Sequence, residues 1–486
     1  MERRQFLAFS LAALLTPDAL HYFTEEYVGE FDADLATFGS RFRSNIESAP
    51  YHAKWVAANK IEAAKWAVFR DAVLTLTGKT DEPQPVPPTM STRYGRAIVA
   101  AGEMHMSISR VVGMMANRHP PPPPPDPSGG APLPPNGWAG PLVISAGGTY
   151  DGRLTGVGWE STTSSPAILI QTTQPVLISG WVRCLAGGHL VDAEAAGASQ
   201  VTLDHIFAYG GTPYQNSGRL YRAYAFKSFT MQNCTIENTR GVELQEPVAA
   251  SGVVITRNRH HNIQGWNNPA GDTDVGGLVQ CRILQNATID ISWNEVVNEY
   301  NLSEPTDIIS LYFTAHARVH DNYIQHQSRI GNVTPSSQNT ITSEGDSRLN
   351  DNIIEDNQVI DAYGIGLHAN AGMGHDNSVL NNRIIGDQFL PTGTQKANGA
   401  GSPLYIATGG TNNHAHGNTV GYIDSSATYI DSSLLAASLT GAPEGGAAEA
   451  ANNTLVPQGQ INASLEAAEW GIWLAKLASN GITIGA

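Results

Sequence analysis

The feature of this chain that most restricts its fold is a short unit that recurs in its second half. The unit reads apolar, two residues, Asn, one residue, apolar, and it occurs at Ile255/Asn258, Ile291/Asn294/Val296, Val319/Asn322/Ile324, Ile354/Asn357/Val359, Val379/Asn382/Ile384 and Ala415/Asn418/Val420. Met231/Cys234/Ile236 is a variant with Cys in place of Asn. Successive units lie 24 to 36 residues apart, which indicates fixed strands joined by loops of variable length.

An Asn between two apolar positions has a physical role in such a repeat. Asn tolerates the left-handed backbone of a tight turn between two short strands, and stacked Asn side chains hydrogen-bond along a ladder. Each repeat therefore predicts a coil of strand, Asn turn, strand, loop, third strand and loop. A leucine-rich repeat would show a Leu consensus, and a propeller needs four strands in a longer unit, so neither fits.

This pattern resembles the right-handed parallel β-helix of the pectate-lyase-like superfamily, which includes polysaccharide lyases, polygalacturonase-type hydrolases and phage tailspikes. The resemblance implies that the third strand of each coil faces the substrate. The polygalacturonase relatives carry Asn-Thr-Asp, Asp-Asp, Gly-His-Gly and Arg-x-Lys in order. This chain has only Gly271–Asp274 and Gly374–His375 as partial matches, and it lacks the Asp-Asp and Arg-x-Lys motifs, which weighs against that activity.

The remainder of the chain divides around this solenoid. We expect an all-β right-handed parallel β-helix, preceded by a small α-helical N-terminal region and a polyproline linker. The predicted boundaries are a signal or first helix at 1–19, an α-helical region at 20–118, a Pro/Gly-rich linker at 119–138, the β-helix at 139–440 and a C-terminal cap at 441–486. The cap, ending in Leu465–Leu477, would protect the open end of the solenoid from edge-to-edge pairing.

Two N-terminal features bear on localisation and assembly. Arg3 and Arg4 ahead of the apolar run Phe6–Leu15 resemble a twin-arginine export signal, which predicts a secreted or periplasmic protein. The alternative is a first helix that stays on the protein. A short heptad seam packs either within the domain or between the chains of a homotrimer, and it consists of Ile98, Ala101, His105, Ile108, Val112 and Met115.

The charge of the chain limits its partners. With 28 basic and 44 acidic side chains the formal net charge is −16, which argues against nucleic acid or an anionic membrane as a partner. A glycan fits better, and a polyanionic glycan would need a local Arg cluster or a bound cation. The three widely spaced cysteines form no disulfide framework or zinc motif, and no apolar stretch predicts a transmembrane segment.

The third strands of the coils supply the candidate binding surface. Because side chains alternate along a strand, placing the apolar ones inside leaves an outward row of polar and aromatic residues. The candidate substrate-binding residues in this row are Asp192, Arg222, Tyr224, Gln245, Gln280, Tyr312, Asn370 and Tyr405. Such a row suits a linear glycan, since sugar rings stack on Tyr and hydroxyls bond to amides and charged groups. The alternative is an ordinary solvated face with a salt-bridge ladder.

The same row holds the candidate catalytic residues, which are Glu243, Arg282, Glu344 and His368. Glu344 and His368 lie on adjacent coils and form a plausible base and acid pair. Asp192 and Glu243, two coils apart, reach the upper limit of the carboxylate spacing in inverting glycosidases, but Arg222 between them would keep both ionised.

A lyase would need a cation to neutralise the uronate of its substrate. Arg282 beside Glu243 is one candidate, and calcium held by Asp272 and Asp274 is the other. No other cofactor is indicated. His260 and His261, on one turn, cannot both face one metal and are interpreted as surface residues.

Two functions remain open on these grounds. The first is an exported β-helix protein that binds and cleaves an extracellular polysaccharide, as a lyase or a glycoside hydrolase. The second is a phage virion spike or surface adhesin that recognises a host glycan without necessarily cleaving it. Retention of residues 1–19 and a trimeric state would favour the second, and a β-helix without a ligand is a third alternative.

Overall fold

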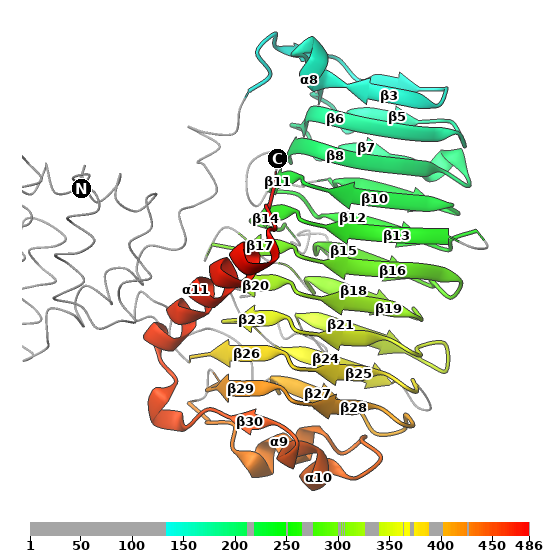
Figure 1. The fold of residues 1–486 in the computed structure, drawn as a ribbon. Coiled ribbons are helices and arrows are strands. Elements are labelled where there is room, and N and C mark those ends of the chain that lie inside the picture. The colour runs from blue at the N-terminus through cyan, green and yellow to red at the C-terminus, as the bar shows by residue number, and fades with distance from the viewer. Residues whose placement is uncertain are drawn as a thin grey trace, which may run out of the picture. The chain divides into compact units, whose positions relative to one another are not determined.

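The computed structural model describes residues 133–485, apart from 211–217, 249–250, 265–275, 300–302, 304, 306, 326–339, 363, 370–373, 388–401 and 425–426. Within this range the chain forms a stack of coils whose strands pair in parallel with those of the next coil (Figure 1). The pairings produce one ten-stranded and one twenty-stranded sheet. This is the parallel β-helix-like architecture that the repeat predicts. The predicted regions 1–19 and 20–118 lie outside the described residues.

Three rows of strands run along the stack, and a coil contributes one strand to each. Row 1 precedes the Asn turn and contains β3 (Gly148–Asp151), the first halves of β6 (Pro175–Cys184) and β8 (Gln200–Tyr209), β10 (Ser228–Gln232), β13 (Ser251–Thr256), β16 (Ala287–Ser292), β19 (Ala317–His320), β22 (Ile353–Glu355), β25 (Ser378–Leu380) and β28 (His414–His416). Row 2 follows the turn and contains β1 (Trp138–Ala139), β4 (Gly158–Ser161), the second halves of β6 and β8, β11 (Thr235–Glu237), β14 (Arg259–His261), β17 (Glu295–Val297), β20 (Tyr323–Gln325), β23 (Gln358–Ile360), β26 (Arg383–Gly386), β29 (Thr419–Tyr422) and β30 (Thr454–Leu455).

Row 3 is the ten-stranded sheet. It contains β2 (Leu142–Ile144), β5 (Ile168–Ile170), β7 (Val191–Asp192), β9 (Tyr221–Tyr224), β12 (Val242–Gln245), β15 (Val279–Arg282), β18 (Ile309–Tyr312), β21 (Ile341–Gly345), β24 (Ile365–Ala369) and β27 (Leu404–Ile406). The inward residues predicted for this row are all buried, namely Val242/Leu244, Val279/Cys281, Ile309/Leu311, Ile341/Ser343, Ile365/Leu367 and Leu404/Ile406. The predicted alternation is therefore confirmed. The three cysteines are free and buried, as expected.

The Asn residues of the repeat form a continuous ladder at the corner between rows 1 and 2. In each step the side-chain amide of one Asn donates to the Oδ1 of the Asn one coil further along, at 2.9 Å. The same Oδ1 accepts the backbone N–H of the preceding Asn. The members of the ladder are Asn258, Asn294, Asn322, Asn357, Asn382, Asn418 and Asn453. The predicted ladder is confirmed, and it satisfies buried amides that would otherwise be costly.

The left-handed residue of this turn differs from the prediction. The ladder Asn residues themselves do not have positive φ, because the sharp bend falls one position earlier. The left-handed residues are Asn233, Arg257, Trp293, Asp321, Asp356, Asn381 and Gly417. Asp, Asn and Gly dominate this set because they adopt that backbone at the lowest steric cost. The ladder Asn is therefore selected for its hydrogen bonds and not for its backbone.

A second corner, ahead of row 3, is packed backbone against backbone. A Cβ on Gly218 would lie 1.8 Å from the carbonyl oxygen of Gly188, and a Cβ on Gly241 would lie 1.8 Å from that of Gly277. Gly241 also has φ of +68°. Only glycine permits this approach, which sets where each strand of row 3 begins.

Two short helices close the C-terminal end of the stack (Figure 1). They are α9 (Ser432–Ser438), which begins at the N-cap Asp431, and α10 (Gly446–Ala451). Leu435 and Leu439 are fully buried in the main core, and the Ser438 hydroxyl donates to the Leu404 carbonyl of the last row 3 strand. These contacts cover the open edge of the final coil.

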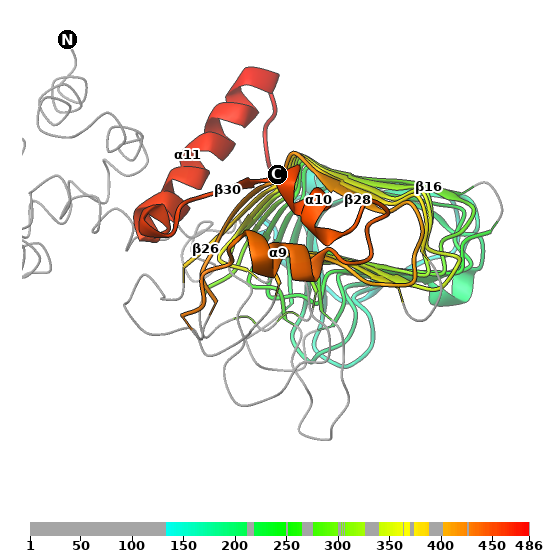
Figure 2. The ribbon, with the colours of Figure 1, turned by 90° about the horizontal axis from the view of Figure 1, so that it is seen from below.

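The long helix α11 (Ala463–Asn480) lies along the side of the stack and not across its end, as the view along the axis shows (Figure 2). Trp473 and Leu477 pack against row 2 residues from four successive coils, which are Val297, Tyr323, Ile360 and Ile385. Trp473 also donates to Glu295 at 3.0 Å, and buried Glu469 pairs with Arg383. The expectation that Leu465–Leu477 closes the end was therefore wrong, since this segment clamps several coils together.

A charged cluster joins α11 to the corner between rows 1 and 2. Lys476 lies 2.6 Å from Asp321, and His320 contacts Asp321 through Nδ1 at 2.7 Å and Asp290 through Nε2 at 3.2 Å. Burial alone lowers the pKa of His320, but the hydrogen bonds to both carboxylates outweigh it and raise the pKa to about 9. His320 is therefore protonated at neutral pH and holds two coils together.

We expect the stability that His320 supplies to depend on pH. Since its pKa is raised above the ordinary value of 6.5, this contribution is complete below pH 6.5 and declines as pH rises toward about 9. We expect urea unfolding between pH 6 and 9.5 to give a lower free energy of unfolding for His320→Gln than for the wild type, and this difference should become smaller as the pH rises. A difference in unfolding free energy that does not change with pH would contradict the assignment. His375→Gln, which removes an exposed pair with Asp376, is the control.

His260 and His261 are buried, which corrects their interpretation as surface residues. They lie in β14, where Thr239 contacts the His260 ring at 3.2 Å and His261 lies 3.1 Å from Glu299 and 3.6 Å from Glu237. Burial lowers the pKa of His260 to about 3, so it is neutral at physiological pH. The pair serves the packing of row 2.

Candidate functional site

Strand register sorts the candidate residues of the row 3 strands into two straight lines. The first line is Asp192, Arg222, Glu243, Gln280 and Ser310. The second line is Tyr224, Gln245, Arg282, Tyr312, Glu344 and His368. Neighbours within a line are one coil apart, which is about 4.8 Å. Tyr405 lies beyond the first line, opposite Gly366.

Glu243 is the centre of an arginine cluster on the first line. Its carboxylate lies 2.7 Å from Nε of Arg219, 3.9 Å from Nε of Arg222 and 3.6 Å from Nη1 of Arg282. The Glu243 side chain is only 9% exposed, so these contacts are shielded from water. Three guanidinium groups surround the Glu243 carboxylate, which is therefore engaged in ion pairs on the first line.

Arg219 was not predicted from the sequence, although it is the nearest partner of Glu243. Arg219 lies directly before strand β9, at the corner formed by Gly218. Because it is outside the strand, the alternation of side chains along the strand does not predict where its side chain points. Its Nη2 also donates to Gln280 at 3.1 Å. The signal that was available is the repeated pair of Gly and a polar residue before row 3, at Gly188–His189 and Gly218–Arg219.

His189 fills the space beside the two inner arginines. Its Nδ1 accepts the backbone N–H of Arg219 at 3.2 Å, and its Nε2 lies 3.3 Å from Arg222. Burial is the largest cause of its lowered pKa, and the neighbouring positive charges add to the effect. A neutral His189 adds no further positive charge beside the two arginines. Glu194, which is more exposed, neutralises Arg222 at 3.1 Å.

Arg282 is the member of this cluster that faces outward. Its side chain is 40% exposed, and its guanidinium lies 5.9 Å from the ring centroid of Tyr312 on the next coil. The guanidinium of Arg222 lies 5.3 Å from the ring centroid of Tyr224. Both arginines thus lie beside an aromatic ring, and the more exposed Arg282 is the one available to an anionic or hydroxylated ligand.

Glu344 lies two coils beyond Arg282 on the second line, with Tyr312 between them. The carboxyl is half-buried, and burial raises its pKa above the ordinary value of 4.5. It makes no ion pair with any residue that the structure describes. An uncompensated carboxyl with a raised pKa beside a tyrosine is the arrangement expected of an acid–base group.

The predicted partner of Glu344 is in register with it. His368 pairs directly across from Glu344 in the adjacent strand β24. The prediction that the two residues lie on adjacent coils is therefore correct for the backbone.

The two glutamates are too far apart to act as a carboxylate pair. Glu243 lies in β12 and Glu344 in β21, which are three coils apart and so separated by roughly 14 Å. Carboxylates of inverting glycosidases are separated by about 6.5–9.5 Å. The geometry therefore favours chemistry in which Glu344 works with groups other than Glu243.

Three predicted site residues cannot be placed. Asn370, Asp272 and Asp274 lie outside the described residues, and with them the predicted calcium site. Comparison with known proteins yields no matching family model, no matching curated protein and no matching solved structure. In the described part of the chain, no helix is long and apolar enough to cross a bilayer.

Proposed function

We propose that this protein binds a linear acidic polysaccharide along the outer face of row 3 and cleaves it beside Glu344. The observation that carries the proposal is the second line, on which outward-facing Arg282, Tyr312 and half-buried Glu344 follow one another at the spacing of the coils. The resemblance of the repeat to the pectate-lyase-like superfamily adds support.

In this proposal each residue of the line has a separate task. Arg282 binds a uronate carboxylate, and Tyr312 stacks against a sugar ring. Glu344 removes the proton on the carbon next to the carboxylate, the bond to the leaving oxygen breaks, and His368 supplies the proton that this oxygen takes up. The product then carries a new carbon–carbon double bond. The raised pKa of Glu344 brings its basicity closer to what proton abstraction requires.

The test is release of reducing ends from a panel of neutral and acidic polysaccharides by the full chain, together with the ultraviolet absorbance of the unsaturated product. We expect cleavage of acidic polymers only, with the absorbing product. Arg282→Gln should weaken binding of the acidic polymer by roughly tenfold or more, because one charged hydrogen-bonding group is lost. Arg318→Gln, which removes an exposed arginine paired with Glu355 on row 1, should change nothing.

Recognition without cleavage is the second candidate, and the arginine cluster favours it. Glu243 is paired with three arginines and lies three coils from Glu344, so these two glutamates do not form the carboxylate pair of a hydrolase. Binding of a glycan without release of any product would establish a spike or adhesin. Export through residues 1–19 and assembly as a trimer remain predictions, and mass spectrometry of the N-terminus and the mass in solution would test them.

A further inference from the structure

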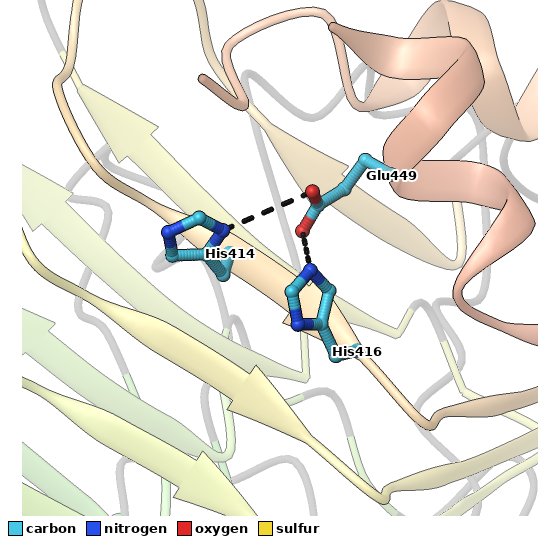
Figure 3. Close-up of side chains that lie close together, drawn as sticks. All are labelled: His414, His416 and Glu449. Atoms are coloured by element: carbon cyan, nitrogen blue, oxygen red, sulfur yellow. Dashed lines mark ion pairs between the residues drawn. The ribbon is translucent and has the colours of Figure 1, made fainter. Parts of the chain in front are cut away.

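The last coil carries a cluster of ligand-type side chains that the proposed function does not use (Figure 3). His414 and His416 project from the same side of β28, and Glu449 projects toward them from α10. One ligand atom from each residue lies within 4.8 Å of the others. His416 Nε2 is 3.2 Å from Glu449 Oε1, and His414 Nδ1 is 3.9 Å from Glu449 Oε2.

Only one of the two carboxylate oxygens of Glu449 accepts a hydrogen bond from the described residues. Because β28 is the last strand of row 1, the Ala415 N–H has no further strand to bond to, and Glu449 Oε1 accepts it. Glu449 is fully buried. Its second oxygen, Oε2, is buried without a hydrogen bond from any residue that the structure describes. A buried carboxylate in this state needs a positive charge close by.

The tautomer of His414 leaves a lone pair facing that carboxylate. Asn412 Oδ1 lies 3.0 Å from His414 Nε2, and the Asn412 amide donates to Asp376, which fixes the orientation of the amide. Nε2 of His414 is thus the protonated nitrogen, and Nδ1 is a lone pair buried opposite Glu449 Oε2. Two acceptor atoms that face each other favour a cation between them.

We propose that His414, His416 and Glu449 bind a divalent transition metal ion, with zinc as the preferred ion. Two imidazoles and one carboxylate are a common zinc ligand set, and the tetrahedral zinc bond lengths of about 2.0–2.1 Å imply ligand separations of roughly 3.3 Å. The separations of 3.2 and 3.9 Å from Glu449 are close to this value, and all three ligand atoms lie within 4.8 Å of one another. The contacts from Ala415 to Glu449 and from Asn412 to His414 are the outer interactions that orient such ligands.

The position of the site indicates what the metal does. It joins α10, part of the cap, to the strand at the open end of row 1, so a bound ion fastens the cap to the stack. The His414 and His416 side chains are 25% and 40% exposed, which leaves a route for the ion and a fourth position for water.

The experiment is zinc titration of the chelator-treated full chain by calorimetry, with cobalt as a spectroscopic substitute. We expect one tight site per chain, a tetrahedral cobalt spectrum and a rise in the urea unfolding midpoint when zinc is added. His414→Gln and His416→Gln should each weaken binding by at least about tenfold and abolish the rise. His316→Asn, at an exposed histidine directly before β19, should bind zinc like the wild type.

Two results would overturn the proposal. One is no zinc binding by the wild type, which would show that the cluster holds no metal ion. The other is a zinc site that survives both His414→Gln and His416→Gln, which would place the ion elsewhere. Both substituted side chains are partly exposed on the last coil. The cobalt spectrum of the wild type needs no variant, and the urea unfolding transition of each variant shows whether it is folded.

Discussion

Replacement of Asn322 by Ala should destabilise the protein by about 3 kcal/mol or more. Asn322 is buried in the middle of the ladder, where its Oδ1 accepts the backbone N–H of Asn294 at 3.0 Å and the Asn294 side-chain amide at 2.9 Å. Its own amide donates to Ile291 and Asn357. The substitution therefore breaks two links of the ladder and leaves buried donors and acceptors without partners.

The measurement is the urea unfolding midpoint of the full chain, followed by circular dichroism. Asn480→Ala is the matched control, because Asn480 is exposed at the end of α11 and its amide bonds to the Lys476 carbonyl. We expect the control to change the unfolding free energy by less than about 0.5 kcal/mol. A similar small effect for Asn322→Ala would mean that the ladder accompanies the fold without stabilising it.

The parts of the fold that follow from short-range pattern were predictable. Alternation located the inward residues of row 3, and the Asn spacing located the ladder, since both depend on residues within one coil. The left-handed position one residue before Asn was missed because Asn is itself a residue that tolerates a left-handed backbone and can also form the hydrogen bonds of the ladder. There was therefore no reason in the sequence to assign the two roles to different positions. Arg257 and Trp293 at that position carry no turn signal.

The parts that depend on contacts between distant segments were not predictable. Nothing near Glu243 in sequence points to Arg219, which reaches it across a coil from a corner. His414 and His416 alternate visibly, so their common face was available from the sequence. Glu449 was not, because its position depends on how α10 packs over the last coil. The course of α11 along row 2 depends in the same way on its tertiary contacts.

Replacement of Glu344 by Gln should reduce turnover by a factor on the order of 10²–10⁴ while leaving the dissociation constant for the polysaccharide nearly unchanged. Gln keeps the size and the hydrogen-bonding oxygen of Glu344 but does not accept a proton. Since the carboxyl makes no ion pair with any described residue, its neutralisation should not disturb the fold. The measurement is kcat and KM for the polymer that the wild type cleaves, with unfolding midpoints as a check.

The matched control is Glu355→Gln, which neutralises a carboxylate paired with Arg318 on row 1. It should leave kcat unchanged. Turnover that survives Glu344→Gln would remove this residue from the chemistry and leave row 3 as a recognition surface, whereas loss of both turnover and affinity would assign Glu344 to binding.

The pH dependence of the wild type separates the two roles open to Glu344. As a base it must be ionised, so kcat/KM should rise with pH through a pKa above the ordinary 4.5, and Glu344→Gln should remove this limb. As an acid it must be protonated, and kcat/KM would instead fall through the same pKa. We expect the rising limb, because elimination beside a uronate needs a base and Glu243, the other glutamate of the two lines, lies three coils away from Glu344.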